Sequence, residues 1–232
     1  MNKRYILTFL LISLIGIGCA YAQRKYVINV NDFTELSVEN NIAVDYFCHP
    51  DSAGMAVIDK TANPDLLYFS NNGKGRLAIQ SSADCPANAT FPHVTVYSTT
   101  LYKVINSGDS LVKVFDVPPT KRFSAHLIGN GRLVAHGIEA DKVDASIDSG
   151  NGQLVISGEC DNANLRNIGK GLIQADGLDA KNVKASILGT GDIGCHASEN
   201  LTIIGMGTGT VFYRDKPEKI KNRGIGVKFS QL

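Results

Sequence analysis

A Gly-x-Gly motif recurs five times in the second half of this 232-residue chain. Successive motifs are separated by 21, 19, 20 and 18 residues. The motifs are Gly129/Gly131, Gly150/Gly152, Gly169/Gly171, Gly189/Gly191 and Gly207/Gly209. A unit of about 20 residues is too short to bury an apolar face on its own, so such units stack and share one core. The spacing therefore predicts a solenoid.

Each unit contains two short stretches in which apolar residues alternate with polar ones, one before the glycines and one after them. Val143, Ala145 and Ile147 illustrate the first stretch, and Leu154 and Ile156 the second. Alternation with period two turns one face of a strand toward a core. The best internal match pairs residues 137–147 with residues 177–187, two units apart. We expect an all-β chain folded as a single right-handed parallel β-helix, or solenoid, with rungs of about 20 residues.

The N-terminus has the pattern of a secretory signal peptide. Lys3 and Arg4 precede an apolar stretch, and Ala20-Tyr21-Ala22 forms an A-x-A cleavage site. We expect residues 1–22 to be a signal peptide and residues 23–232 to be one solenoid domain. Residues 48–72 and 81–92 do not follow the repeat, and we expect irregular loops near them. A loop-borne binding site would belong there.

Both readings of the N-terminus predict export. After simple cleavage the protein would lie in the periplasm, on the outer membrane surface or outside the cell. The alternative is cleavage before Cys19 and attachment through a lipid on that residue. No later segment reaches the ~20 apolar residues that a transmembrane helix needs, so none is expected.

Composition excludes some partners. The formal net charge is +1, and no long run of one sign interrupts the chain, so nucleic acid is not expected as a partner. The chain has no Trp and 7% aromatic residues, which argues against a groove rich in stacking rings. Nothing in the motifs calls for a cofactor or a metal ion.

Four cysteines follow Cys19. An oxidising compartment permits disulfides, and Cys48 and Cys85 each lie just ahead of a proline in a loop-like stretch. A bridge between them is one alternative that the sequence leaves open. Cys195 occupies an inward strand position and is expected to act as a small buried apolar residue.

Five residues after the second glycine of each unit, outward side chains fall at equivalent positions. They are His136, Ser157, Asp176, His196 and Arg214. In a stacked solenoid these residues would form one column, which is the candidate binding surface. His136 and His196 would be three rungs apart, roughly 14 Å, so one metal ion could not bind both. A solvated polar face is the alternative interpretation of the same pattern.

The chain also resembles a known family. The resemblance rests on the signal peptide, residues 33–38, residues 101–108, the Gly-x-Gly rungs and the closing residues 207–217. Together they are similar to the putative auto-transporter adhesin, head GIN domain family. The resemblance implies a β-helical envelope protein of Gram-negative bacteria with no defined molecular function and no catalytic residues to transfer. The serines usual in that family's Gly-Ser-Gly are replaced here by Asn130, Asn151, Lys170, Thr190 and Thr208.

Two classes of function follow. The first is a non-catalytic binding, adhesion or structural module that presents a repetitive surface to glycans or to envelope and host surface proteins. The alternative is a carbohydrate-active enzyme, a polysaccharide lyase or hydrolase, with Asp176 and His196 in its groove. Asp144 and Asp148 would lie about 13 Å apart along one strand, which is too far for a glycosidase pair. A third interpretation is a scaffold that assembles through exposed edge strands.

Overall fold

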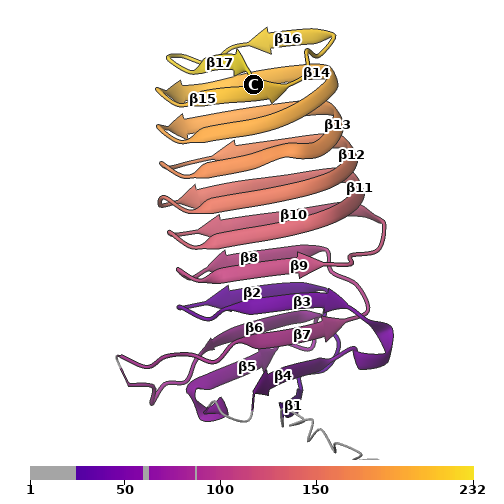
Figure 1. The fold of residues 1–232 in the computed structure, drawn as a ribbon, viewed down its shortest axis with the longest axis vertical. Coiled ribbons are helices and arrows are strands. Elements are labelled where there is room, and N and C mark those ends of the chain that lie inside the picture. Colours follow the sequence, from indigo (N-terminus) through magenta and orange to yellow (C-terminus); the bar gives the residue numbers. More distant parts are fainter. Residues whose placement is uncertain (1–24, 60–62, 87) are drawn as a thin grey trace, which may run out of the picture.

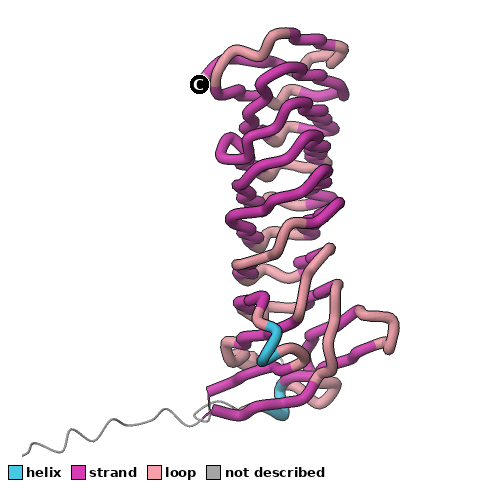
Figure 2. Tube along the Cα trace, turned by 90° about the vertical axis from the view of Figure 1, so that its right-hand side faces the viewer, coloured by secondary structure: helices cyan, strands magenta, loops and turns pink. Residues whose placement is uncertain are grey.

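The computed structural model describes residues 25–59, 63–86 and 88–232, and the regular structure in these ranges is nearly all β-strand. Two single-turn 3-10 helices, Pro50–Ser52 and Pro64–Leu66, lie at the N-terminal end (Figure 2). The strands are β1 Lys25–Asn29, β2 Glu35–Glu39, β3 Val44–Cys48, β4 Met55–Asp59, β5 Leu67–Asn71, β6 Arg76–Ser81, β7 Val94–Ser98, β8 Lys103–Ser107, β9 Leu111–Phe115, β10 Thr120–Ile128, β11 Arg132–Ser149, β12 Gln153–Asn167, β13 Leu172–Gly189, β14 Asp192–Gly207, β15 Thr210–Arg214, β16 Lys219–Asn222 and β17 Lys228–Gln231. Within these ranges, no helix is long and apolar enough to cross a membrane. The all-β class is confirmed.

The chain winds into a β-solenoid, a tall coil in which each turn lays one strand segment on each of two faces (Figure 1). We call the face before each Gly-x-Gly the leading face and the face after it the trailing face. Strands β11 to β14 are long because each runs along the trailing face, bends through a corner, and continues along the leading face of the next turn. We call this bend the strand corner, and the Gly-x-Gly turns the glycine corner.

The predicted repeat is confirmed by the strand register. Leu133 pairs with Leu154, Leu154 with Ile173, Ile173 with Ile193, and Ile193 with Val211. All five side chains point into the core and are 0% exposed. Burial of one such side chain stabilises the fold by about 1.5 to 3 kcal/mol, so the stacked aliphatic columns supply the main cohesion of the coil.

The glycine corner is too tight for a side chain. A Cβ atom on Gly171 would lie 2.3 Å from the carbonyl oxygen of Gly152, and one on Gly191 would lie 2.4 Å from that of Gly171. Backbone of one turn therefore rests directly on backbone of the turn below. Because each contact involves the equivalent position about 20 residues earlier, glycine recurs with the period of the coil.

At the N-terminal end the order of the turns departs from the order of the sequence. Strand β2 pairs with both β6 and β8, and β3 pairs with both β7 and β9, all in parallel. The turn formed by β2 and β3 therefore lies between the β6–β7 turn and the β8–β9 turn (Figure 1). After β1, which lies at the end of the coil, the chain forms the second turn with β2 and β3. It then completes the end of the coil and continues with β8 and β9 on the other side of β2 and β3.

The segment between β3 and β6 closes this end of the coil. We expected residues 48–72 to be an irregular loop, but they contain β4 and β5. Strand β4 runs antiparallel to β1 and β7, and β5 runs antiparallel to β6. The repeat is lost there because antiparallel strands joined by local turns need no fixed period. Residues 82–93, by contrast, contain no strand where they are described.

The other end of the coil is less protected. Strand β16 pairs with β14 and β17 pairs with β15, and no further pairing of either is found in the described chain. Phe229 in β17 is 44% exposed, although Val211, at the equivalent position one turn earlier, is fully buried. Each of the last two strands thus leaves one backbone edge open.

Candidate functional site

The strand corner contains steps in the pairing of β11 to β14. The register shifts between Ala135 and Ile138, between Val155 and Ser157, and between Ala175 and Asp179. Such shifts place different numbers of residues in successive turns of the corner, as β-bulges do. Outward side chains at equal sequence spacing therefore need not lie above one another here.

Four residues of the predicted column form two separate pairs. His136 Nδ1 lies 2.9 Å from Ser157 Oγ in the next turn. His196 Nδ1 lies 2.7 Å from Arg214 Nη2, also one turn away. The structure therefore brings together neighbours within each pair but does not join the pairs.

Asp176 is not the residue that links them. The pairing of β13 with β14 sets Asp179 opposite His196, because three extra residues of β13 occupy the bend after Ala175. The expected column is corrected at this point: Asp179 takes the place expected for Asp176. The enzyme hypothesis placed Asp176 and His196 on one face, whereas the strand register sets Asp179 opposite His196.

Asp179 is part of a cluster of four charged or polar side chains. Its Oδ1 lies 2.7 Å from His196 Nδ1 and 2.5 Å from Arg214 Nη2. On the other side of the ring, His196 Nε2 lies 3.4 Å from Asp215 Oδ2. The Nδ1 atom cannot both donate to Asp179 and accept from Arg214, so the tautomer decides which of these hydrogen bonds forms.

The cluster affects the charge of Asp179. The hydrogen bond from His196, supported by the nearby Arg214 guanidinium, holds the pKa of the Asp179 carboxyl below its usual value, against a smaller opposing effect of burial. The Asp179 side chain is 55% exposed and that of Asp215 is 75% exposed. Water screens pairs at this exposure, so the cluster fixes the shape of the corner more than it stabilises the fold.

A groove of about 520 Å³ follows the strand corner beside this cluster. Five carboxylates line it: Glu139, Asp141, Glu159, Asp161 and Asp179. Its floor is formed by small residues in register, Ala140, Cys160 and Ala180. Lys181, which is paired with Asp161 at 2.6 Å, and His196 are its basic residues. We call this hollow the corner groove.

The corner groove is an acidic surface. Glu139, Glu159 and Asp179 pair in consecutive turns, so their backbones lie one strand spacing apart, about 4.8 Å. Among the described residues, no group of three or more His, Cys, Asp or Glu is arranged to hold a metal ion. What the arrangement can do is attract cations and repel anions along one corner of the coil.

The acidic residues of the corner groove were missed by the sequence analysis, although a signal existed. Glu139 and Asp179 occupy the third position of the two best-matching segments, residues 137–147 and 177–187. Counting from the glycine corner gave Asp176 because that count assumes equal turns. Counting backward from the next leading strand, where pairing is regular, gives Asp179.

The cysteine predictions have different outcomes. Cys48 and Cys85 are both free, and the disulfide left open above is not formed. The Cys48 thiol donates to the carbonyl oxygen of Thr99 at 3.0 Å, and the Cys85 thiol lies 3.7 Å from that of Pro86. Cys48 ends β3 on the trailing face, whereas Cys85 follows the end of β6 on the leading face. Cys19 and the signal peptide lie outside the described residues.

Two other cysteines are buried. Cys195 is 0% exposed in the core, as predicted. Burial raises the pKa of the Cys160 thiol, in the floor of the corner groove, to about 12, and that of Cys195 to about 12 as well. Both thiols therefore stay protonated at neutral pH and are weak nucleophiles.

Solved structures with the same fold come from Bacteroides and Parabacteroides species. A putative adhesin from Bacteroides fragilis has a TM-score of 0.78 at 20% identity, over 90% of this chain and 96% of that one. A putative lipid binding protein from Parabacteroides distasonis has a TM-score of 0.66 at 20% identity, over 89% and 96%. A putative adhesin from Parabacteroides merdae has a TM-score of 0.65 at 16% identity, over 90% and 95%. At these identities the similarity establishes the fold.

A search of curated protein sequences finds no match to this chain. The model of one protein family matches residues 32–217, which include the turn formed by β2 and β3, the glycine corner and the corner groove. The chain belongs to the family described as putative auto-transporter adhesin, head GIN domain.

Proposed function

We propose that this protein is an exported, non-catalytic binding module of the cell envelope that uses the outside of the solenoid for adhesion. The proposal places residues 23–232 beyond the cytoplasmic membrane, with the coil as a rigid support. Its ligands would be glycans or proteins of the envelope or of a host surface.

The observation that carries this proposal is the fixed arrangement of outward polar side chains on the leading face. Asn182 Nδ2 donates to Asn162 Oδ1 at 3.3 Å, and Asn200 Nδ2 donates to Asn182 Oδ1 at 2.6 Å. Nearby, Asn164 Nδ2 donates to Asp144 Oδ1 at 3.3 Å. Hydrogen bonds between turns hold these groups in place before any ligand arrives, which reduces the entropy lost on binding.

The family and its solved relatives support the same proposal. Two of the relatives are named putative adhesins, and the family description also names an adhesin head. The relative named a putative lipid binding protein extends the set of candidate ligands to lipid-linked molecules. These names describe binding proteins, and a binding protein at a cell surface is consistent with an exposed, repetitive coil.

The proposal is tested with purified protein on a panel of immobilised glycans and host-matrix proteins. We expect saturable retention by at least one class of ligand, with no change in ligand length and no new reducing ends. Loss of retention across the whole panel, together with new reducing ends from an acidic polysaccharide, would instead favour the enzyme. Product analysis on the same samples separates the two results.

A second function, assembly through the C-terminal end, is favoured by the open edges of β16 and β17. Lys228 N and Leu232 N donate back to the previous turn, to the carbonyl oxygens of Gly209 and Tyr213. In a parallel ladder the intervening residues direct their backbone groups the opposite way. Phe229 and Gln231 therefore present backbone donors to a strand from another chain.

If the edge mediates assembly, the molar mass measured by light scattering should rise with protein concentration. Gln231→Pro removes one outward N–H and should lower the mass at a given concentration, whereas Gln231→Ala, which keeps the N–H, should not. A constant monomer mass for the unmodified protein up to high concentration would exclude this function.

A further inference from the structure

The leading face contains a second groove, formed where β8 and β10 differ in length. Strand β10 has nine residues and β8 has five. Their pairing begins at Ser124 and Lys103, so residues 120–123 of β10 have no β8 partner. The result is a groove of about 750 Å³. This volume lies in the range of sites that hold small ligands or short oligomers.

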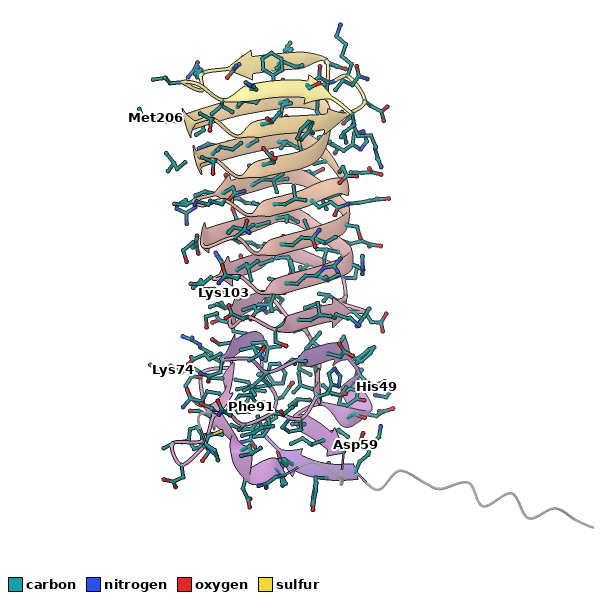
Figure 3. The ribbon with its side chains drawn as sticks, turned by 60° about the vertical axis from the view of Figure 1, so that its left-hand side comes forward. His49, Asp59, Lys74, Phe91, Lys103 and Met206 are labelled. Atoms are coloured by element: carbon teal, nitrogen blue, oxygen red, sulfur yellow. The ribbon has the colours of Figure 1, made fainter. Side chains whose placement is uncertain are left out.

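The groove is positively charged. Lys103, Lys121 and Arg122 line it, against one carboxylate, Glu35. Arg122 already has a carboxylate partner, because its Nε donates to Asp144 Oδ2 at 2.7 Å. The two lysines have no carboxylate within ion-pair distance in the described part of the chain. Their charges are thus available to an anion. Figure 3 labels Lys103 among the side chains outside the coil.

An aromatic ring lies next to these charges. Tyr102 directly precedes Lys103, lines the groove and is 46% exposed. A phenol ring offers a broad, rigid surface at small entropic loss, and a hydroxyl group at its end. The apolar C–H face of a pyranose ring is one partner for such a surface. A single ring suffices for one sugar unit, although the chain lacks the aromatic content of a longer stacking groove.

The deeper part of the groove is polar but uncharged. Ser124 is 8% exposed, and His126 Nδ1 lies 2.7 Å from Ser146 Oγ. Burial lowers the pKa of His126, with Lys103 adding to the effect and Asp148 opposing it, so the ring is neutral at neutral pH. Hydroxyl and imidazole groups exchange hydrogen bonds readily with the hydroxyls of a sugar.

The corner groove limits the direction in which a bound anionic chain can run. The two hollows share Pro119 and Thr120, and beyond these residues lie the five carboxylates of the corner groove. An anionic chain that enters the positive groove is repelled at that boundary. It would therefore stay on the Lys103 and Tyr102 side of that boundary.

We propose that this groove binds an acidic oligosaccharide, with a carboxylate, sulfate or phosphate on Lys103 and Lys121 and one pyranose ring against Tyr102. The inference rests on the proposed binding function and gives it a ligand class. The acidic sugar can belong to a free polysaccharide or to a glycolipid, since both present the same chemistry to the groove.

The test is calorimetric titration with a short oligogalacturonate and with its methyl ester, which has the same rings without the charges. The unmodified protein should bind the acid at least about tenfold more tightly than the ester. The double variant Lys103→Gln/Lys121→Gln should lose about tenfold in affinity for the acid and little for the ester. Tyr102→Ser should weaken binding of both ligands by a similar factor.

Lys184→Gln is the matched control, because Lys184 lies outward on the same face but outside this groove. It removes one lysine charge, half the change in the double variant, and should leave both affinities within about twofold. Equal binding of acid and ester, or an equal loss in the control and the double variant, would overturn the proposal.

Vesicles carrying an acidic glycolipid form the second arm of the test. Binding to both the vesicles and the free sugar supports the sugar site, whereas binding to vesicles alone contradicts it.

These results are distinguishable from failure of the binding function itself. Retention on neutral glycans or matrix proteins, with no binding of the acidic sugar, rejects the groove and leaves the function intact. No retention by any ligand rejects the function. Thermal unfolding of each variant, expected to match that of the unmodified protein, verifies that the substitutions act on the groove.

Discussion

Gly191→Ala is expected to destabilise the solenoid by about 3 kcal/mol, at the upper end of the range for overpacking. A Cβ at this position would lie 2.4 Å from the carbonyl oxygen of Gly171 and 2.5 Å from Asn167 Nδ2. The first atom belongs to the backbone of the turn below and cannot rotate away. The turns must therefore separate locally, which weakens the strand pairing on both faces. Urea unfolding followed by circular dichroism measures the loss.

Gly194→Ala is the control within the same turn. Gly194 lies in β14, three residues beyond Gly191, and its added Cβ would have Asp176 Oδ1 as its nearest neighbour at 3.4 Å. That neighbour is the end of a side chain, and the φ angle of Gly194 is not in the left-handed region. We expect a change within about 0.5 kcal/mol. If both variants lose the same stability, backbone contact between turns is not the reason for the glycine repeat.

The glycine contacts also explain why this part of the fold was predictable. Where the backbone of one turn rests on that of another, the residue must be glycine and the number of residues between contacts is constrained. The repeat of about 20 residues could therefore be recognised in the sequence. The register from Leu133 to Val211 follows that repeat. Alternating apolar residues then identify the inward faces of the strands.

The order of the first turns was not predictable in the same way. The turn formed by β2 and β3 has Asn40, with φ of 60°, where later turns have a glycine. The structure places the carbonyl oxygen of Asn40 so near Gly108 that a Cβ there would lie 1.5 Å from it. These residues are 68 positions apart, and no repeat connects them. Spacing reveals which turn follows in the chain, but not which turn lies beneath.

The candidate site shows a related limit. On the flat faces, stacked side chains such as Asn162 and Asn182 recur about every 20 residues, because strand pairing is regular there. The corner between faces absorbs extra residues without breaking the coil, so Asp179 replaced Asp176 beside His196. The positive groove depends on a difference in strand length between β8 and β10, which the alternation of side chains does not encode.

Polar residues inside the core were likewise unforeseen. Asn106 and Asn167 occupy inward positions otherwise held by aliphatic residues, and both are 0% exposed. Asn106 Nδ2 donates to the carbonyl oxygens of Ser110 and Arg132, at 3.0 and 3.1 Å. Both acceptors lie just past the glycine corner. A buried amide at this place ties the corner to the core of the coil.

Asn167→Asp is expected to lower stability by about 3 to 5 kcal/mol at neutral pH. Asn167 Nδ2 donates to the carbonyl oxygens of Gly171 at 2.7 Å and Asp192 at 3.0 Å. An aspartate of nearly the same shape would replace this donor with a negative oxygen facing two others. Burial would also remove the charge from water with no cation to compensate for it.

The pH dependence gives this prediction a distinct signature. Burial would raise the pKa of the new carboxyl in the folded state above its value in the unfolded chain. Stability of the variant is then greatest below the unfolded pKa of about 3.9 and falls as the pH rises through the folded pKa. The gap between the variant and the unmodified protein should therefore widen from pH 4 to pH 7.

Two further substitutions separate charge from shape. Asn151→Asp makes the same chemical change at the exposed tip of a glycine corner and should alter stability by less than about 0.5 kcal/mol. Asn167→Leu matches the aliphatic residues Ile147 and Ile187 that pair with this position, and removes the two hydrogen bonds without adding a charge. Gly171 O keeps a donor in this variant, because it also accepts from Asp192 N at 3.1 Å. Asn167 Oδ1 has no donor in the described chain, so no hydrogen bond to that oxygen is lost. We therefore expect the variant to lose less than about 1.5 kcal/mol of stability. A loss for Asn167→Leu as large as that for Asn167→Asp, with no dependence on pH in either variant, would assign the effect to the missing hydrogen bonds and contradict the buried-charge explanation.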